Sequence, residues 1–265
     1  MNDQELVAEI GTEEGRTLAE ILLSDDPTEG LWDLVESGAA ADWFPELPAL
    51  ALEQDPVHRH KDVLAHTIAV TAKTSPSLRV RMGALFHDIG KPRTRSFEHG
   101  GVTFRHHEAV GARMTRKRLR ALEYPTVLVD DVSRLVELSG RFHSYDEDWT
   151  DSAVRRYARD AGHLLGVLNE QIRCDCTTKD PKKVARLQRK MDHLEARIAD
   201  LAREDARRAE RPDLDGAEIM EHLGIPPGRV VGQARNHLLE LRREKGPLTR
   251  DEALAALDEW WAGQQ

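Results

Sequence analysis

The sequence predicts an all-α protein with a single small β-hairpin. The chain of 265 residues is 32% charged and only 5% aromatic, and its abundance of Arg and Glu favours helices. Most of the chain divides into helical stretches that are separated by turns rich in Pro, Gly and Ser. The one strand signal is RSFEHGGVTFRH, in which Gly100 and Gly101 separate two short runs with alternating apolar residues, a pattern typical of a hairpin.

Four helices are expected before the hairpin. The first ends at the turn SDDP, the second leads into the loop WFPELPAL with its two prolines, and the fourth ends at Gly90-Lys91-Pro92. The expected ranges are 12–23, 30–40, 63–73 and 80–89.

The remaining helices follow the hairpin. Two are expected over residues 107–122 and 127–138, with Pro125 as the break between them, and Asp151 is the expected N-cap of the next. A last helical unit covers residues 211–261, where the segment 224–228 forms a turn between two helices.

An apolar stripe with spacings of three and four predicts one long helix near the C-terminus. Its members are Val184, Leu187, Met191, Leu194, Ile198 and Leu201. The short length of the stripe favours a helix packed on its own domain. The alternatives are an antiparallel helical arm and the seam of a homodimer.

The composition excludes some classes of protein. No run of about 18 apolar residues exists, so no membrane span is expected, and the acidic N-terminus without an apolar core indicates a cytoplasmic protein. The net charge of −9 argues against a protein that coats nucleic acid over its whole surface. Cys174 and Cys176 are too close to pair comfortably and form no C-x-x-C half-site for zinc.

Histidine is concentrated in one part of the chain. Seven of the twelve histidines fall within fifty residues: His58, His60, His66, His87, His99, His106 and His107. This concentration of histidines has two possible explanations, a metal site and an accident of composition. His58, His60 and His99 belong to expected surface loops.

The position of His87-Asp88 favours the metal site. The pair ends an apolar helix, where an ionised carboxylate is costly unless it is paired or binds a metal. Antiparallel packing with the preceding helix would bring His66 close to it. Imidazole nitrogens with carboxylates suit Mn, Fe, Co, Ni or Zn.

These residues carry a family resemblance. VLAHTIAV, LFHDIGKP, HHEAVGA and CDCTT resemble, in this order, the H…HD…D pattern of the HD superfamily of metal-dependent phosphohydrolases. Longer segments, among them GKPRTRSFEHGGVTFRHHEAVGARMTRKRLRAL and LDGAEIMEHLGIPPGRVVG, are similar to the C-terminal part of actinobacterial-type CCA-adding tRNA nucleotidyltransferases with a fused HD domain. The resemblance covers nearly the whole chain.

The resemblance implies an HD-domain helical bundle followed by a helical C-terminal tail. It divides the chain into a neck-like helical segment (1–50), an HD metal-dependent phosphohydrolase domain (51–180) and a tail similar to the tRNA-binding tail of CCA-adding enzymes (181–265). The nucleotidyltransferase head of those enzymes carries paired aspartates on a strand. Asp25-Asp26 instead lies in a turn after an expected helix, so we expect no CCA addition by this chain.

The resemblance also implies the ligands of one divalent metal ion, which would be Mn, Ni, Co, Fe, Zn or Mg. The implied ligands are His66, His87, Asp88 and Asp175. His107 and His143 are the candidate ligands of a second ion. Related sequences commonly carry histidine where this chain has Ser139, so a single metal is the expectation.

The implied function is hydrolysis of a phosphate ester on a nucleotide, a 2′,3′-cyclic phosphate or an RNA end. Asp88 would orient the attacking water, while Lys91 and Arg141 would neutralise the phosphate. For both cations the alternative is a surface charge at a helix C-terminus. The rival function is a non-catalytic module that binds tRNA through the basic segment 179–211.

Overall fold

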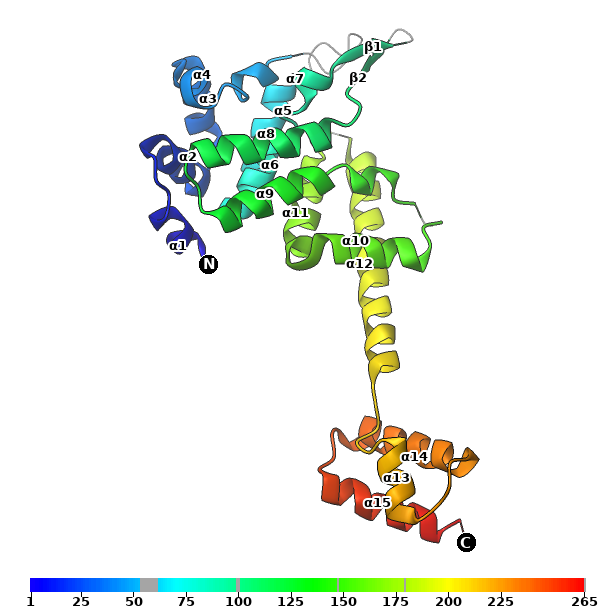
Figure 1. Ribbon diagram of the computed structural model, residues 1–265. Coiled ribbons are helices and arrows are strands. Elements are labelled where there is room, and N and C mark those ends of the chain that lie inside the picture. The colour runs from blue at the N-terminus through cyan, green and yellow to red at the C-terminus, as the bar shows by residue number, and fades with distance from the viewer. Residues whose placement is uncertain (53–61, 99–100, 147, 179, 265) are drawn as a thin grey trace. The chain divides into compact units, whose positions relative to one another are not determined.

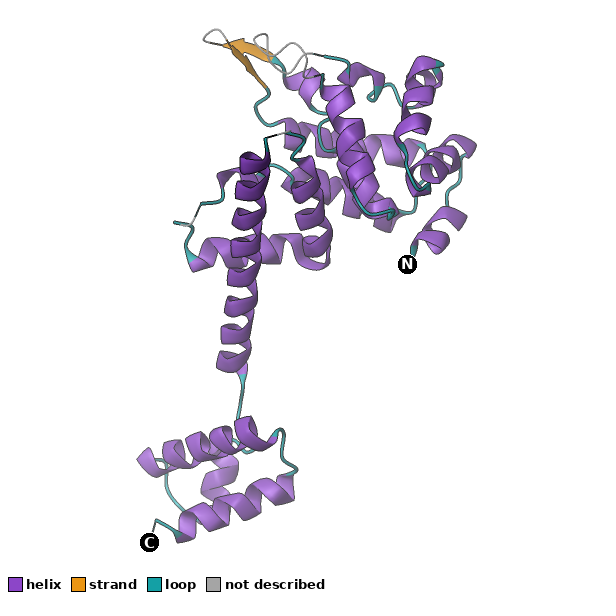
Figure 2. Ribbon diagram, turned by 180° about the vertical axis from the view of Figure 1, so that it is seen from behind, coloured by secondary structure: helices purple, strands orange, loops and turns teal. Residues whose placement is uncertain are grey.

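The structure, a computed structural model, describes residues 1–52, 62–98, 101–146, 148–178 and 180–264. Within these residues it is all-α apart from an antiparallel hairpin of β1 (Ser96–Glu98) and β2 (Gly101–Thr103), in which Phe97 lies opposite Val102 (Figures 1 and 2). The predicted fold class and the predicted hairpin are therefore confirmed. His58, His60 and His99 lie outside the described residues.

The chain divides into two compact units, Met1–Ile198 (unit 1) and Ala199–Gln265 (unit 2). Helices of unit 1 are α1 (Asp3–Ala8), α2 (Glu13–Leu23), α3 (Thr28–Glu36), α4 (Ala39–Trp43), α5 (Val63–Lys73), α6 (Leu78–Phe86), α7 (Lys91–Thr94), α8 (His107–Ala121), α9 (Thr126–Leu138), α10 (Asp151–Ala161) and α11 (Leu165–Asp175), with 3-10 turns at Pro48–Leu50, Arg141–Ser144 and Gly162–Leu164. Helix α12 (Pro181–Ala209) contains the division between the units, and α13 (Gly216–Leu223), α14 (Arg229–Lys245) and α15 (Arg250–Ala262) belong to unit 2.

Helix α6 occupies the centre of unit 1. Every residue from 80 to 90 is buried, because α6 packs against α2, α5, α9 and α11. A helix that is buried on all sides is typical of such a central position. Helices α8 and α9 lie side by side and cover one flank (Figure 1). The core thus holds the end of α6, where His87 and Asp88 follow.

The N-terminal helices share this core. Leu18 and Leu31 belong to the same buried cluster as Leu85. The buried guanidinium of Arg81 donates to the backbone oxygens of Leu22, Ser24 and Asp25 at the end of α2. Buried cations need such partners, so the contact fixes α2 against α6.

Three of the expected helices differ from the structure at their ends or in continuity. The helix expected over 30–40 is two helices, because Gly38 adopts a positive φ of 82° between them. The central helix ends at Phe86, earlier than the expected residue 89. Gly90 is the N-cap of the short α7, whose first turn accommodates Pro92. The N-cap of α10 is Thr150, whose hydroxyl accepts from the Ala153 amide, rather than Asp151.

The apolar stripe of α12 faces the chain itself. Met191 and Leu194 are fully buried, and Glu195 accepts hydrogen bonds from Asn169 and Arg173 of α11. This burial favours packing on its own domain, as the short stripe predicts. A homodimer stays a prediction.

Unit 2 has a core of its own, formed by Leu214, Ile219, Val231, Ala234, Leu238, Ala253 and Leu257. Asp215 and Thr249 form capping boxes at the starts of α13 and α15, and Gly224 ends α13 with a positive φ of 62°. The predicted turn between α13 and α14 lies where the sequence places it, between Leu223 and Arg229. None of the helices in the described part of the chain has the length and apolar character needed to cross a bilayer.

Candidate metal centre

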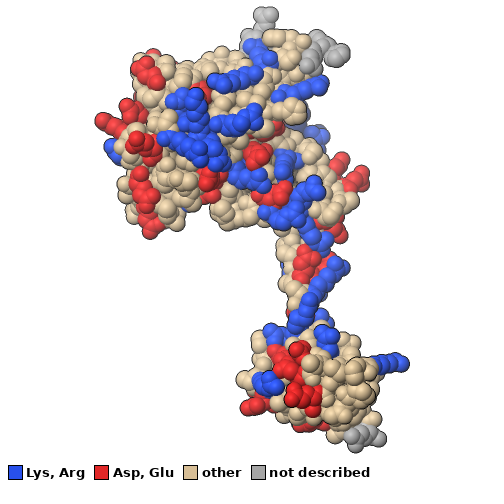
Figure 3. Space-filling view, in the orientation of Figure 1, with Lys and Arg blue, Asp and Glu red and all other residues tan. Residues whose placement is uncertain are grey.

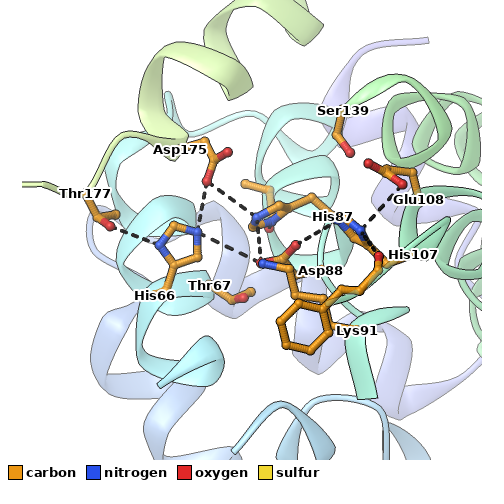
Figure 4. A network of polar contacts seen from close by, with 12 residues as sticks. His66, Thr67, His87, Asp88, Lys91, His107, Glu108, Ser139, Asp175 and Thr177 are labelled. Carbon is orange, nitrogen blue, oxygen red and sulfur yellow. Dashed lines mark hydrogen bonds and ion pairs between the residues drawn. The ribbon is translucent and has the colours of Figure 1, made fainter. Parts of the chain in front are cut away.

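Four helices bring imidazoles and carboxylates to one place (Figure 4). His66 lies in the first turns of α5, His87-Asp88 directly follows α6, His107 starts α8 and Asp175 ends α11. One ligand atom from each of His66, His87 and Asp88 lies within 4.8 Å of the others. We call His66, His87, Asp88 and Asp175 the cluster.

Short distances join the members of the cluster. His66 Nε2 lies 2.9 Å from Asp175 Oδ1 and 4.0 Å from Asp88 Oδ2. His87 Nε2 lies 3.2 Å from Asp88 Oδ2 and 3.6 Å from Asp175 Oδ1. The two Nε2 atoms and the two carboxylates therefore converge on one another.

The electrostatics of the cluster are strongly coupled. Burial alone would lower the pKa of His87, but the carboxylates of Asp88 and Asp175 outweigh it and raise that pKa to about 10. Burial works to raise the pKa of Asp88, and the charges of His87 and Lys91 with a hydrogen bond from His107 hold it well below the usual range. A buried carboxylate is thus kept ionised by surrounding cations and donors.

The hydrogen bonds of His87 show that a cation fits between these groups. Its Nδ1 lies 2.7 Å from the Ala84 carbonyl oxygen. A carbonyl only accepts, so Nδ1 carries the proton, and Nε2 of a neutral ring then presents a lone pair to the oxygens of Asp88 and Asp175. Only a proton or a metal cation between Nε2 and the carboxylate oxygens would remove the repulsion between their lone pairs. Orientation of the ring through Nδ1 is also the usual arrangement for a metal-binding histidine.

His107 repeats this arrangement on the other side of Asp88. Its Nδ1 lies 2.9 Å from the Phe104 carbonyl oxygen, and its Nε2 lies 3.5 Å from Asp88 Oδ1. Glu108 adds a carboxylate, with Oε2 3.5 Å from His107 Nδ1. The hydroxyl of Ser139 donates to the Val136 carbonyl of its own helix. Position 139 therefore supplies no nitrogen ligand on the side of Asp88 where His107 lies.

Lys91 points at Asp88 as well. Its Nζ lies 2.7 Å from Asp88 Oδ2, and the ammonium lies 5.6 Å from the centre of the Phe104 ring. The side chain is 12% exposed. The alternative of a freely solvated surface cation therefore does not describe Lys91.

Two predicted residues have other surroundings. Arg141 forms an ion pair with Asp160 of α10, and hydrogen bonding from Arg141 lowers the pKa of Asp160. His143 lies in the 3-10 turn Arg141–Ser144 and lines a basic pocket with Cys176 and Lys183. Within the part of the chain that the structure describes, neither side chain makes a polar contact with the cluster.

Sequence reasoning missed three polar groups around the cluster. Thr177 Oγ1 lies 3.0 Å from His66 Nδ1, and Glu108 contacts His107. The buried hydroxyl of Thr67 has no hydrogen-bond partner within the described residues. The segment HHE could have indicated Glu108 by adjacency, but no sequence signal connects Thr177 to His66.

The two cysteines are free thiols on either side of Asp175. Cys174 Sγ lies 3.4 Å from the Lys73 carbonyl oxygen, and burial raises its pKa. A thiol with a raised pKa remains protonated at neutral pH, whereas a metal ligand must be a thiolate. Among the described residues, the groups that lie close enough together to hold an ion are His66, His87 and Asp88, so the donor atoms are nitrogen and oxygen.

The comparisons with known proteins agree with this geometry. The family model described as "HD domain" matches residues 63–207, a range that contains every member of the cluster. The chain is 32% identical over 257 residues to a CC-adding tRNA nucleotidyltransferase of Thermus thermophilus, an alignment that covers 94% of this chain and 56% of that protein.

A second relative is matched over a similar share of the chain. The chain is 30% identical over 248 residues to an A-adding tRNA nucleotidyltransferase of Deinococcus radiodurans, across 91% of this chain and 56% of the relative. The chain thus spans slightly more than half the length of both curated relatives. The match over residues 63–207, more than half of its length, shows that the chain belongs to the HD domain family.

Proposed function

We propose that this chain is a metal-dependent phosphohydrolase that acts on nucleotides, 2′,3′-cyclic phosphates or RNA ends. The observation that carries the proposal is the convergence of two imidazole Nε2 atoms and two carboxylates on one buried position. His66, His87, Asp88 and Asp175 would hold one divalent ion. The nitrogen and oxygen donors suit Mn, Fe, Co, Ni or Zn better than a hard cation.

A bound divalent ion supplies a water of lowered pKa and polarises a phosphoryl oxygen. Asp88 would orient the attacking water through Oδ1, which lies on the side of His107, while Oδ2 contacts His87 and Lys91. Lys91 would offset negative charge on the phosphate. The ring of His107 is fixed by the Phe104 carbonyl and would hold a proton or a second ion at Nε2.

Metal analysis tests the proposal most directly. Asp88→Asn removes one charge from the cluster with almost no change in volume, and we expect it to lose stoichiometric metal and hydrolysis of bis-p-nitrophenyl phosphate. His222→Ala is the matched control, because His222 pairs with Asp258 in unit 2. Full metal occupancy in Asp88→Asn, or hydrolysis as fast as that of the parent, contradicts the proposal.

The pH dependence gives a second check on the same site. Imidazole must be neutral to bind a metal, so protons compete with the ion as the pH falls. We expect hydrolysis to be faster at pH 8 than at pH 5.5 under a fixed concentration of free metal. Equal rates at the two pH values would show that the imidazoles do not bind the metal.

Unit 2 supports a second candidate function, the binding of tRNA. A cavity of about 800 Å³ in this unit is lined by Arg207, Arg208, Arg211, Arg229, Arg235 and Arg243. Glu210, which pairs with Arg243, is the one carboxylate among the lining residues that the structure describes. Such a concentration of Arg suits phosphate groups, and both curated relatives are named for tRNA.

Variants of this cavity test tRNA binding independently of hydrolysis. Arg211→Gln with Arg229→Gln and Arg235→Gln should weaken tRNA binding in a filter assay and reduce its dependence on salt. Lys245→Gln with Arg250→Gln, in the same unit but outside the cavity, is the control. If the control weakens tRNA binding as much as the cavity variant, the cavity is not the binding site.

A further inference from the structure

A second basic cavity lies in unit 1, beside the cluster. Its volume is about 750 Å³. Its wall includes Cys176 and Thr178, which flank the Thr177 that contacts His66. Cys176 directly follows Asp175, so the cavity adjoins a member of the cluster through the backbone. We call it the α12 pocket.

The charge of the α12 pocket is strongly positive. Lys183, Arg186, Arg189 and Lys190 of α12 line it, and Asp146 is the one carboxylate among its described lining residues. Lys183, Arg186 and Arg189 form no ion pair with any residue that the structure describes. Cations without partners in a concave wall attract anions, because the low-dielectric walls focus the field.

The arrangement of the cations suits several phosphates rather than one. From Lys183 to Lys190 the helix rises about 10 Å at 1.5 Å per residue, which is longer than a single phosphate group. Lys190 lies 5.9 Å from the ring centre of Phe142 and 5.8 Å from that of Tyr145, and such contacts hold an ammonium in place.

The rings of Phe142 and Tyr145 are not available for stacking with bases. Phe142 is 2% exposed and Tyr145 is fully buried, so neither face is free for a base. The cations of the pocket would contact the sugar-phosphate backbone, which carries no sequence information. Its volume is in the range of pockets for drug-sized ligands, too small for a duplex.

We propose that the α12 pocket binds the backbone of a single-stranded oligonucleotide whose terminal phosphoester reaches the cluster. This inference rests on the proposed phosphohydrolase function and narrows its substrate to the end of a nucleic-acid strand. A mononucleotide with its phosphate at the cluster would have no further phosphate to contact Lys183 and Arg186.

Binding to metal-free protein tests the pocket without requiring hydrolysis. The probe is a fluorescent single-stranded oligoribonucleotide of ten residues, measured by anisotropy with the full chain. All proteins carry Arg229→Gln and Arg235→Gln, so that the arginine cavity of unit 2 does not mask the result. Lys183→Gln with Arg186→Gln and Arg189→Gln should weaken binding about ten-fold or more at low salt and make the salt dependence less steep.

The matched control removes the same charge from another basic surface. Lys and Arg side chains gather over α8 (Figure 3), and Arg113, Lys117 and Arg120 are exposed there. Their triple replacement by Gln should change the affinity less than two-fold. Equal losses in the two triple variants, or parent-like binding by the α12 triple variant, overturn the proposal.

Two further arms identify the ligand class. Ten-residue oligonucleotides of different sequence should bind alike, while a mononucleotide should bind much more weakly. A short inorganic polyphosphate that binds as tightly as the oligonucleotide would show a site for phosphate chains and overturn the assignment to nucleic acid. Hydrolysis of bis-p-nitrophenyl phosphate is assayed separately, so failure of the hydrolase proposal is distinguishable from failure of the pocket.

Discussion

Asp88 is the residue on which the cluster depends. It is 2% exposed, yet His87, Lys91 and His107 all approach its two oxygens. Removing the charge of such a carboxylate leaves the facing cations uncompensated. Asp88→Asn removes that charge but preserves the shape of the side chain, so it tests the role proposed for the carboxylate more cleanly than a truncation would.

A pH effect on stability is expected at Tyr124, away from the cluster. Burial raises the pKa of its phenol, and its hydroxyl donates to the Gly15 carbonyl at 2.6 Å. The pKa is higher in the folded than in the unfolded chain, so the stabilisation is complete below about pH 10 and declines as the pH rises further.

Tyr124→Phe should therefore cost about 1 kcal/mol at pH 7 through the lost hydrogen bond, and less at pH 11. Urea unfolding midpoints at pH 7, 9.5 and 11 measure the difference between the variant and the parent. Tyr157, whose pKa burial also raises, offers the same test through Tyr157→Phe. A difference that stays constant across the three pH values contradicts the linkage.

Part of the residue-level arrangement could be predicted from the sequence. His87-Asp88 ends an apolar helix, and this local signal was enough to place a costly carboxylate beside the core. The convergence with Asp175 followed only from the family resemblance. The contact of Thr177 with His66 joins positions more than one hundred residues apart, and no local pattern encodes such a contact.

At the scale of elements, the turn that leads into α7 meets the backbone of α8. A Cβ at Gly90 would lie 2.1 Å from the His107 carbonyl oxygen and 2.8 Å from the Gly111 nitrogen. Glycine at this position therefore permits the close approach of the turn that follows Asp88 to the start of α8. The approach sets the distance between Asp88 and His107.

Gly90→Ala should accordingly separate the two elements. The φ of Gly90 is −78°, so the strain comes from the lack of space, and overpacking of this kind costs about 1–3 kcal/mol. We expect weaker metal binding by titration calorimetry together with a lower unfolding midpoint. Gly166→Ala is the control, because a Cβ there meets no atom within 4 Å; a parent-like metal affinity in Gly90→Ala would refute the coupling.

The existence of a helix was easier to predict than the residues at which it begins and ends. The break at Gly38 was missed because its positive φ is a backbone property that the surrounding apolar residues do not reveal. Thr150 and Asp151 are both good N-caps, and the sequence alone could not decide between neighbours. The long α12 was predictable because its stripe persists over several turns.

At the scale of the whole molecule, the two units have separate cores. Leu85 is buried in the core of unit 1 and Leu238 in that of unit 2. We therefore expect two calorimetric transitions. A saturating transition metal should increase the free energy of unfolding of unit 1 alone, by about 2.7 kcal/mol when its free concentration is 100 times the Kd. Only the calorimetric transition of unit 1 should then shift to a higher temperature.

Core variants assign the two transitions. Leu238→Ala should destabilise unit 2 alone, by about 2–5 kcal/mol, and Leu85→Ala should do the same to unit 1. Differential scanning calorimetry with and without metal measures both. One transition that moves in response to either variant would mean that the units unfold together.

The contact of Arg81 with the end of α2 bears on how such chains can be recombined. The family match begins at residue 63, but a guanidinium inside that range donates to carbonyl oxygens of residues 22, 24 and 25. A gene fusion that transferred only the matched range would remove these acceptors and expose the apolar face of α6 that the N-terminal helices cover. The unit that can be exchanged between proteins is therefore larger than the matched range and includes the N-terminal helices.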